Sequence, residues 1–305
     1  MSLTFTGERF LPECAGEMVY EHWHRYLIAQ QYVRGLRVLD VASGEGYGSH
    51  LLARDAASVV GVDLSADAVL HATSRYPAAN LRYIAASCIQ IPQPDASFDV
   101  IVSFETIEHI MEHEAFLREV DRLLAPGGMF IISSPNRVEY SDRTGYKNEF
   151  HVKELDRAEL KTLLDPFFPA QQWFAQRAAF HSMVWPVDAV ANSAVALTAD
   201  GESGFPSEVY FLVFCARDAT RLAAVESQLS LVTDRELSVY SEWSRTYRDN
   251  AAMQAEIKAL KADAAARASL PHTLVAAPAA AATPAPAPSR DTTLVRWAKK
   301  LTGSH

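Results

Sequence analysis

The sequence predicts an α/β fold in which a mostly parallel, seven-stranded sheet is covered by helices on both faces. Short apolar runs rich in β-branched residues alternate with helical stretches over the first two thirds of the chain, a pattern typical of parallel sheets. Two later runs, 171–176 and 208–217, could close one edge of the same sheet. The earlier expected strands are 37–42, 58–64, 80–87, 98–104 and 128–134.

Composition and charge exclude several classes of protein. The 305 residues include 28 Lys and Arg against 37 Asp and Glu, a net charge of −9, whereas a general nucleic-acid binder is expected to be basic. Cys14, Cys88 and Cys215 are widely spaced and form no Cys-x-x-Cys pair, which favours a reducing compartment. No apolar run reaches the roughly 20 residues that a membrane-spanning helix needs. We therefore expect a cytoplasmic protein.

A glycine-rich turn follows the first expected strand. Gly44, Gly46 and Gly48 precede a helix, where glycine lets the backbone approach a ligand closely. Asp63 ends the second strand, 19 positions after Gly44, the separation at which a carboxylate can accept hydrogen bonds from both hydroxyls of a ribose. The alternatives are a tight turn without a ligand and, for Asp63, a helix cap with Ser65. Together the two features indicate an adenosine-containing ligand.

The spacing of the glycines discriminates between two such ligands. Dinucleotide-binding turns have the order G-x-G-x-x-G, whereas this turn has G-x-G-x-G after Ala42 and Ser43, which favours S-adenosylmethionine (SAM) over NAD. The segments IPQPDASFDVIVSFETIEHI (91–110) and FLREVDRLLAPGGMFIISSPN (116–136) agree with this choice. Over residues 35–217 the chain resembles the class I SAM-dependent methyltransferases, whose fold is Rossmann-like.

The resemblance implies how SAM would be bound. The glycine turn would contact its methionine part, the acid that ends the second strand its ribose, and the end of the third strand its adenine. Ala42 stands where the family usually has glycine and Ser87 where it usually has aspartate, so these departures bear on the affinity for SAM. The implied residues are Asp40, Ala42, Gly44, Gly46, Asp63, Leu64, Ser87 and Cys88.

A second cluster of functional side chains follows the fourth expected strand. Glu105, Glu108 and His109 lie within one helical turn, and the Glu-x-x-Glu-His arrangement resembles that of metal-dependent O-methyltransferases. That resemblance adds His151 as a fourth ligand of a Mg²⁺ or Mn²⁺ ion, which would bind and acidify the acceptor hydroxyl. In the alternative, Glu108 and His109 only shape the turn and Glu105 faces the amino group of SAM. Without a metal, His109 or His151 is the expected general base.

The residues ahead of the predicted domain, 1–34, form a candidate lid. A helix from about residue 19 would place Tyr20 and His24 on one face, with Arg25 beside them, and in several methyltransferases such a helix closes over SAM. In the alternative, these side chains only pack on the domain surface. The methyltransferase domain itself is expected over 35–218.

The chain beyond the predicted domain has three parts. Residues 219–268 are predicted to form a long helix, and an interrupted 3-4 heptad rhythm favours a coiled coil and a homo-oligomer over a helix folded back on its own domain. The Pro/Ala-rich segment 269–290 is expected to be an extended tether. Residues 291–305 have the composition of a short basic amphipathic tail, suited to a membrane surface or a groove in an assembly partner, or of a frayed terminus.

The motifs GERFLPE and YEHWHRY followed by LDVASGEGYGS are similar to those of methyltransferases of bacterial surface-polysaccharide (O-antigen or capsule) assembly. This resemblance implies a SAM-dependent O-methyltransferase, EC 2.1.1, acting on a sugar hydroxyl of a glycan, nucleotide-sugar or lipid-linked precursor at the inner face of the membrane. The alternatives are a small-molecule O-methyltransferase, for a phenol or quinone precursor, and a SAM-binding scaffold in the assembly complex. The acidic chain argues against RNA 2′-O-methylation.

Overall fold

The computed structural model describes residues 17–179, 204–233 and 237–268. The predicted tether and tail, and the first 16 residues of the candidate lid, lie outside this part of the chain. The chain divides into two compact units, Met1–Ser244 and Arg245–His305. In the described residues, no helix has the length and apolar character of a membrane span.

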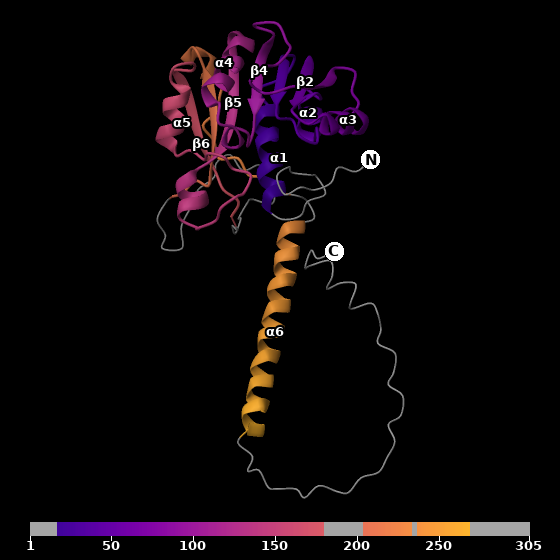
Figure 1. Ribbon diagram of the computed structural model, residues 1–305, viewed down its shortest axis with the longest axis vertical. Coiled ribbons are helices and arrows are strands. Elements are labelled where there is room, and N and C mark those ends of the chain that lie inside the picture. Colours follow the sequence, from indigo (N-terminus) through magenta and orange to yellow (C-terminus); the bar gives the residue numbers. More distant parts are fainter. Residues whose placement is uncertain (1–16, 180–203, 234–236, 269–305) are drawn as a thin grey trace, which may run out of the picture. The chain divides into compact units, whose positions relative to one another are not determined.

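All seven predicted strands are present in the first unit (Figure 1). The strands are β1 (Arg37–Val41), β2 (Ser58–Asp63), β3 (Leu81–Ala85), β4 (Phe98–Ser103), β5 (Leu124–Pro135), β6 (Ala170–Gln176) and β7 (Tyr210–Ala216). The helices are α1 (Glu17–Gln30), α2 (Tyr47–Leu52), α3 (Ala66–Arg75), α4 (His113–Leu123), α5 (Arg157–Leu164) and α6 (Ser238–Ala268). Three short turns are η1 (Ile107–His109), the π-helical η2 (Val138–Asp142) and η3 (Ala219–Leu222).

The sheet has the order β3-β2-β1-β4-β5-β7-β6. Strands β1 to β5 are parallel where they pair, and β7 runs antiparallel to both β5 and β6. The prediction that the last two strands close one edge of a mostly parallel sheet is therefore confirmed. Because β1 to β4 are parallel, the loops after their carboxyl ends meet at one edge, where open α/β sheets bind ligands.

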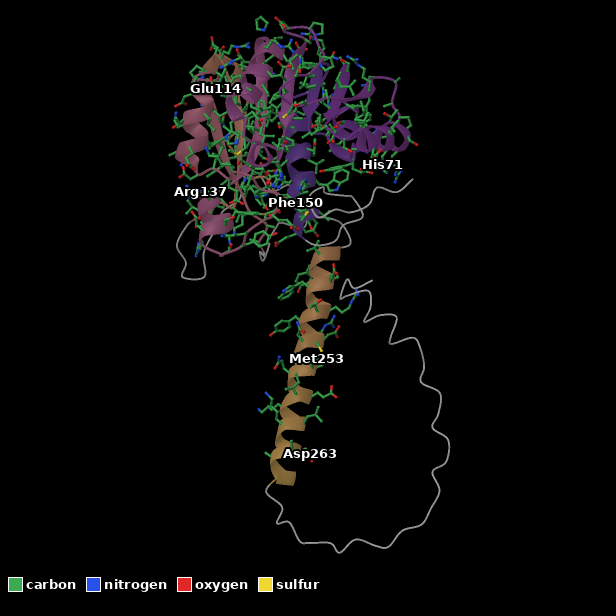
Figure 2. The ribbon with its side chains drawn as sticks, in the orientation of Figure 1. His71, Glu114, Arg137, Phe150, Met253 and Asp263 are labelled. Carbon is green, nitrogen blue, oxygen red and sulfur yellow. The ribbon has the colours of Figure 1, made fainter. Side chains whose placement is uncertain are left out.

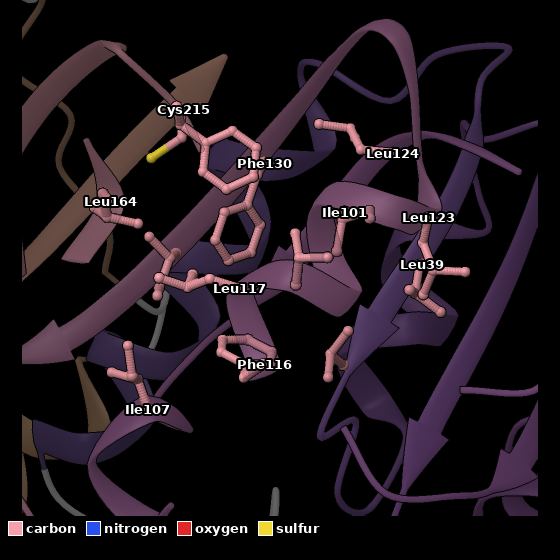
Figure 3. Packing of buried hydrophobic residues seen from close by; sticks show 14 of the residues in the cluster. Leu39, Ile101, Ile107, Phe116, Leu117, Leu123, Leu124, Phe130, Leu164 and Cys215 are labelled. Carbon is pink, nitrogen blue, oxygen red and sulfur yellow. The ribbon is translucent and has the colours of Figure 1, made fainter. Parts of the chain in front are cut away.

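Each face of the sheet is covered by its own core. Strand residues alternate between the faces, so Leu39 joins the cluster packed under α4 and α5 (Figure 3), whereas Val38 joins the cluster packed under α1 and α2. Phe116 of α4 and Phe130 of β5, both 0% exposed, pack edge to face in the first cluster. The second cluster includes Tyr26, whose hydroxyl reaches the candidate site described below.

The predicted long helix over 219–268 is wrong in its first part. Leu222 and Val225, which fit the heptad rhythm, are buried in the cluster of α1 and α2 instead, at 8% and 7% exposure. Among the described residues between β7 and α6, which begins at Ser238, the 3-10 turn η3 is the one helical element. The apolar spacing of these two residues therefore serves the core of the domain, and a coiled coil can involve only the later residues.

Ala42 adopts a left-handed backbone conformation, with a φ of 60°. A Cβ atom makes this region unfavourable by about 1 to 2 kcal/mol, whereas glycine enters it freely. We expect Ala42→Gly to raise the free energy of unfolding, measured by urea titration, by about 0.5 to 1 kcal/mol after the greater flexibility of unfolded glycine is subtracted. The exposed helical residue Ala158 is the control, since Ala158→Gly should lower it by about 1 kcal/mol. Equal losses in both variants would contradict this prediction.

Candidate active site

Asp63 holds the glycine turn from the end of β2. One carboxylate oxygen accepts a hydrogen bond from the Gly44 amide at 2.9 Å and the other from the Ser65 amide at 2.9 Å. The cap of α3 is Ser65, whose hydroxyl accepts from the Ala68 amide at 3.2 Å, so Asp63 is not the cap. The structure thus brings Asp63 and Gly44 together as the spacing predicts, and the contact with ribose stays a prediction.

Asp40 lies inside the protein beneath this turn. It is 0% exposed and accepts hydrogen bonds from the Ser49 hydroxyl at 2.6 Å and the Tyr26 hydroxyl at 3.1 Å. Burial raises the pKa of Asp40 to about 7, and the two hydroxyls oppose this rise. The carboxylate of Asp40 therefore joins β1, α2 and α1 beneath the glycine turn. The predicted contact of Asp40 with the cofactor stays a prediction.

The glycines of the turn have separate roles. Gly44 and Gly46 have positive φ angles of 56° and 98°. A Cβ atom on Gly46 would lie 2.6 Å from the Cβ of Ala72 and 2.9 Å from the hydroxyl of Tyr83, so this position is occupied by α3 and β3 rather than by a ligand. This packing explains why position 46 must be a glycine, and the predicted contact of the Gly46 backbone with a ligand stays a prediction. Gly44, held by Asp63, remains a candidate for the same contact.

The predicted adenine contacts meet beside Asp63. Leu64 is 79% exposed directly after it, and the Ala86 amide donates to the Asp63 carbonyl at 3.0 Å, which brings the end of β3 to the same edge. Ser87 and Cys88 follow there and are half-buried. Burial raises the pKa of the Cys88 thiol to about 11. Leu64, Ser87 and Cys88 therefore lie at one edge of the sheet, and their contact with an adenine base stays a prediction.

Arg25 reaches from α1 to the end of β4. It is 1% exposed, its Nε donates to the Gln176 side chain at 2.7 Å, and its guanidinium lies 4.6 Å from the centre of the Tyr210 ring. One terminal nitrogen is 3.6 Å from Glu105, which also accepts from the Ser133 hydroxyl at 2.6 Å. The other, Nη1, is buried and has no hydrogen-bond partner among the described residues. A buried cation with an unused donor is suited to an anionic group of a ligand.

The other predicted lid residues make contacts of their own. His24 bonds the Ser230 hydroxyl at 2.8 Å and lines a small cavity of about 130 Å³ with Tyr32 and Phe174, and its predicted contact with the cofactor stays a prediction. Tyr20 is half-buried on the same helix. The side chains that α1 does bring to the glycine turn are not among the predicted site residues. They are Tyr26, packed edge to face on Tyr47 and Phe104, and His22, 3.3 Å from the Tyr47 hydroxyl.

Glu108, His109 and His151 form one compact group. One ligand atom of each lies within 4.8 Å of the other two. The Nδ1 of His109 lies 2.9 Å from the Phe150 carbonyl oxygen (Phe150 is labelled in Figure 2), and since a carbonyl only accepts, Nδ1 carries the proton. The lone pair on Nε2 then faces Glu108, 3.9 Å away. Backbone contacts such as this commonly orient a histidine for a metal or a proton.

Glu108 is a buried carboxyl with both oxygens unpaired among the described residues. Burial, and then the charge of Glu105, raise its pKa well above the ordinary value, against the opposing effect of Arg25. A carboxyl in such a place is either protonated or compensated by a cation. Its backbone carbonyl accepts from the Val152 and Lys153 amides at 2.8 and 3.0 Å, which joins the η1 turn to the segment of His151.

The outer partners of His151 orient its ring. Its Nδ1 lies 2.6 Å from Glu154, and Asn148 lies 3.0 Å from its Nε2. A carboxylate on Nδ1 is typical of histidines that ligate a metal through Nε2, here after displacement of Asn148. Helix α5 begins after Asp156, which forms a capping box with Glu159, so Glu154 is not the N-cap of this helix. The remaining predicted ligand, Glu105, bonds Ser133 and Arg25 and is not part of this group.

An aromatic wall adjoins His151. Tyr140 stacks on the His151 ring at 5.4 Å and contacts the rings of Tyr146 and Tyr210, each at 5.8 Å. Tyr140 belongs to the π-helical turn η2, a distortion frequently found at functional sites. Aromatic contacts therefore run from His151 through Tyr140 to Tyr210, whose ring the Arg25 guanidinium contacts.

Glu21, one helical turn before Arg25, makes stability depend on pH. Burial raises its pKa from 4.5 to about 7, so the folded state holds a proton that the unfolded state loses above pH 4.5. The free energy of unfolding therefore falls as pH rises from about 4.5 to 7. We expect Glu21→Gln, which mimics the protonated form, to be more stable by about 2 to 3 kcal/mol at pH 8 and equal to the natural protein at pH 4.

Denaturant titration at several pH values measures this effect. The exposed Glu17 on the same helix is the matched control, and Glu17→Gln should leave the pH dependence in place. In the Glu21→Gln protein the free energy of unfolding is still expected to fall somewhat as pH rises, because the pKa of Asp40 is also raised to about 7. A Glu21→Gln protein that loses stability at pH 8 would show that its charge is needed beside Arg25.

Comparison with known protein families agrees with this geometry. Residues 39–132, from β1 to β5, match the family model described as a methyltransferase domain. Residues 39–132 are thus similar to a methyltransferase domain, and the order of the seven-stranded sheet is typical of the class I fold. The matched segment of the methyltransferase domain includes the glycine turn, Asp63, Glu105 and the pair Glu108 and His109, whereas His151 and Arg25 lie outside it.

Three curated proteins are similar to this methyltransferase domain. A "Probable S-adenosylmethionine-dependent methyltransferase" of Mycolicibacterium smegmatis is 40% identical over 167 residues, 54% of this chain and 64% of that protein. A fatty-acid O-methyltransferase of the same organism is 36% identical over 105 residues, 34% of this chain and 38% of that protein. A ubiquinone biosynthesis O-methyltransferase of Rhizobium rhizogenes is 35% identical over 107 residues, 34% and 43% of the two chains. The chain thus spans less than two thirds of each relative.

Proposed function

We propose that the protein is a SAM-dependent O-methyltransferase that acts on a small-molecule acceptor. The observation that carries this proposal is the group of Glu108, His109 and His151 at the carboxyl end of β4. In it the buried Glu108 carboxyl has no hydrogen-bond partner among the described residues and lies 3.9 Å from the Nε2 of His109. This group lies at the sheet edge that also holds the glycine turn and Asp63, so a methyl donor and a proton acceptor would meet there.

SAM is assigned to the edge formed by β1, β2 and β3. Asp63 would accept from the ribose, Leu64, Ser87 and Cys88 would contact the adenine, and Gly44 the methionine part. The unpaired Nη1 of buried Arg25 supports a contact with the carboxylate of SAM. Glu105, beside it, has the charge that the amino group of SAM requires.

Methyl transfer is an in-line displacement at a sulfonium, so the protein must align two ligands, exclude water and take one proton from the acceptor. The Nε2 of His109 is suited to take that proton, because the Phe150 carbonyl holds the ring in the required tautomer. The three side chains also fit a divalent cation, since the carboxyl of Glu108 is buried without a hydrogen-bond partner among the described residues and the charge of Arg25 only partly opposes the rise of its pKa. Mg²⁺ or Mn²⁺ held by Glu108, His109 and His151 would lower the pKa of an acceptor hydroxyl.

Two observations favour one class of acceptor, namely the aromatic rings beside His151 and the names of the relatives. Tyr140, Tyr146 and Tyr210 offer faces for an apolar or planar molecule. The relatives named for fatty acids and for ubiquinone biosynthesis modify small molecules, which favours such an acceptor over the polysaccharide predicted from the sequence motifs. A sugar hydroxyl is the second candidate. The third is a scaffold that binds SAM without turning it over.

This proposal is tested by incubating the purified protein with labelled SAM and with each of three panels of acceptors. The panels are fatty acids, phenols or quinols, and nucleotide sugars or lipid-linked glycans. We expect label in the first or second panel. Transfer only to the glycan panel would replace the small-molecule acceptor by the sugar. Binding of SAM with no transfer to any panel, and no difference between the natural protein and Glu108→Gln, would indicate the scaffold.

Removal of metal tests the divalent site separately. Dialysis against EDTA is expected to lower turnover at least about 10-fold, with recovery on addition of Mn²⁺ or Mg²⁺. The control is SAM affinity by calorimetry, which should not change because Asp63 and Arg25 are not in the proposed ligand set. Unchanged turnover in EDTA would remove the metal and leave His109 as the proton acceptor.

A further inference from the structure

Helix α6 carries an apolar row at heptad spacing that faces solvent. Met253, Ile257 and Leu260 are 52%, 43% and 61% exposed, and every described side chain from Arg245 to Ala266 is exposed. Figure 2 shows the side chains standing out from α6, with Met253 and Asp263 labelled. The row can be written as heptad positions a and d. Position a holds Trp243, Asn250, Ile257 and Ala264, and position d holds Val239, Thr246, Met253 and Leu260.

The charges of α6 follow the same repeat. Acidic side chains occupy the g position, directly before each a residue, in four successive heptads. The e position, directly after each d residue, carries no acid and has one lysine. The g residues are Glu242, Asp249, Glu256 and Asp263, and the e residues are Tyr240, Tyr247, Gln254 and Lys261.

This arrangement distinguishes the two ways in which a second helix can pack. In an antiparallel pair g faces g, which would set acidic rows against each other. In a parallel pair g faces the e residue five positions later in the partner, so Glu256 meets Lys261 and Glu242 meets the Tyr247 hydroxyl. The charge pattern therefore disfavours the antiparallel pair and is complementary in the parallel one.

The a and d residues also indicate two strands in register. A β-branched residue at a with leucine at d, as in Ile257 and Leu260, favours a dimer in parallel coiled coils. A single asparagine at an a position, here Asn250, bonds its own copy only when the helices are parallel and aligned, and it fixes the register at some cost in stability.

We propose that α6 forms a parallel, two-stranded coiled coil with α6 of a second copy of this chain. The interface is the apolar row of Trp243, Met253, Ile257 and Leu260 together with Asn250, and it is independent of the proposed methyl transfer. The contact begins only at α6, because Leu222 and Val225 are buried in the methyltransferase domain.

Mass measurement by light scattering on the full chain tests the pairing. The natural protein is expected at twice the mass of one chain. The double variant Ile257→Asp and Leu260→Asp should fall to one chain at the same concentration, with a dissociation constant raised at least about 100-fold. Ala255→Asp and Ala262→Asp add the same charge at the outward f position and should stay dimeric. A natural protein with the mass of one chain, or of three or four, would overturn the proposal.

Cysteine cross-linking tests the orientation. In a parallel pair in register each d residue faces its own copy, so M253C and L260C should both form disulfide-linked dimers under mild oxidation. The outward variant A259C and the natural protein, with its own cysteines, measure the background. An antiparallel pair could bring only one such position to its two-fold axis, so cross-linking of one variant alone, or of neither, would refute the parallel arrangement.

Discussion

Replacing Glu108 by glutamine is expected to lower the rate of methyl transfer about 100-fold or more without loss of stability. The substitution keeps the shape of the side chain but removes the carboxyl that lies 3.9 Å from the Nε2 of His109. Since both oxygens of Glu108 are buried and unpaired in the described structure, the folded protein gains little from their charge. Steady-state kinetics and urea titration of the same preparation measure the two effects.

Glu119 provides the matched control for Glu108. It is also buried, at 9% exposure, but its oxygens accept from the Ile91 amide at 2.7 Å and from Arg122 at 2.7 and 2.8 Å. Glu119→Gln should therefore cost about 1 to 3 kcal/mol of stability and leave the rate of methyl transfer unchanged. Loss of stability without loss of rate in Glu108→Gln would mean that Glu108 only supports the η1 turn.

Gly48→Ala is expected to unfold the α1 side of the site. An added Cβ would lie 2.1 to 2.4 Å from three atoms of the Tyr26 ring, which is itself 5% exposed and packed against Tyr47 and Phe104. The ring must move, and its hydrogen bond to Asp40 is then lost. We expect a loss of about 3 kcal/mol or more in the free energy of unfolding, and weaker SAM binding by calorimetry.

A double-mutant cycle checks the cause. Tyr26→Ala removes the clashing ring, so adding Gly48→Ala to it should cost far less than in the natural protein. Gly204→Ala is the control, because a Cβ there meets nothing within 4 Å among the described residues. Additive losses in the double variant would show that Gly48 is needed for a reason other than the Tyr26 contact.

Helix α1 shows what the spacing of residues predicts about a helix and what it leaves open. The spacing of Tyr20 and His24 predicts a helix with both on one face, and the helix is present. Its buried face, however, is the row of Glu21, Arg25 and Ala29. A period of 3.6 residues relates the side chains of one helix to each other, but the rotation of the helix against the sheet depends on packing with α2 and β7.

The same distinction applies to Leu222 and Val225. Their spacing continues the heptad rhythm of α6, and nothing local separates them from it. Both residues are buried in the domain core because the η3 turn that holds Leu222 packs against β5, β6 and β7, whose apolar side chains belong to the same cluster. Periodicity alone does not tell a residue that packs on a distant element from one that packs on a second chain.

The strands, their mostly parallel arrangement and the glycine turn with Asp63 can be predicted from the amino-acid sequence, because they depend on short apolar runs and on two adjacent strand ends. The contacts of Arg25 with Glu105, of Tyr26 with Asp40 and of His109 with the Phe150 carbonyl are seen only in the folded protein. The folded protein also separates Glu105 from the group of Glu108 and the histidines. These contacts join residues on elements that become neighbours only when the whole sheet is formed, so no local spacing specifies them.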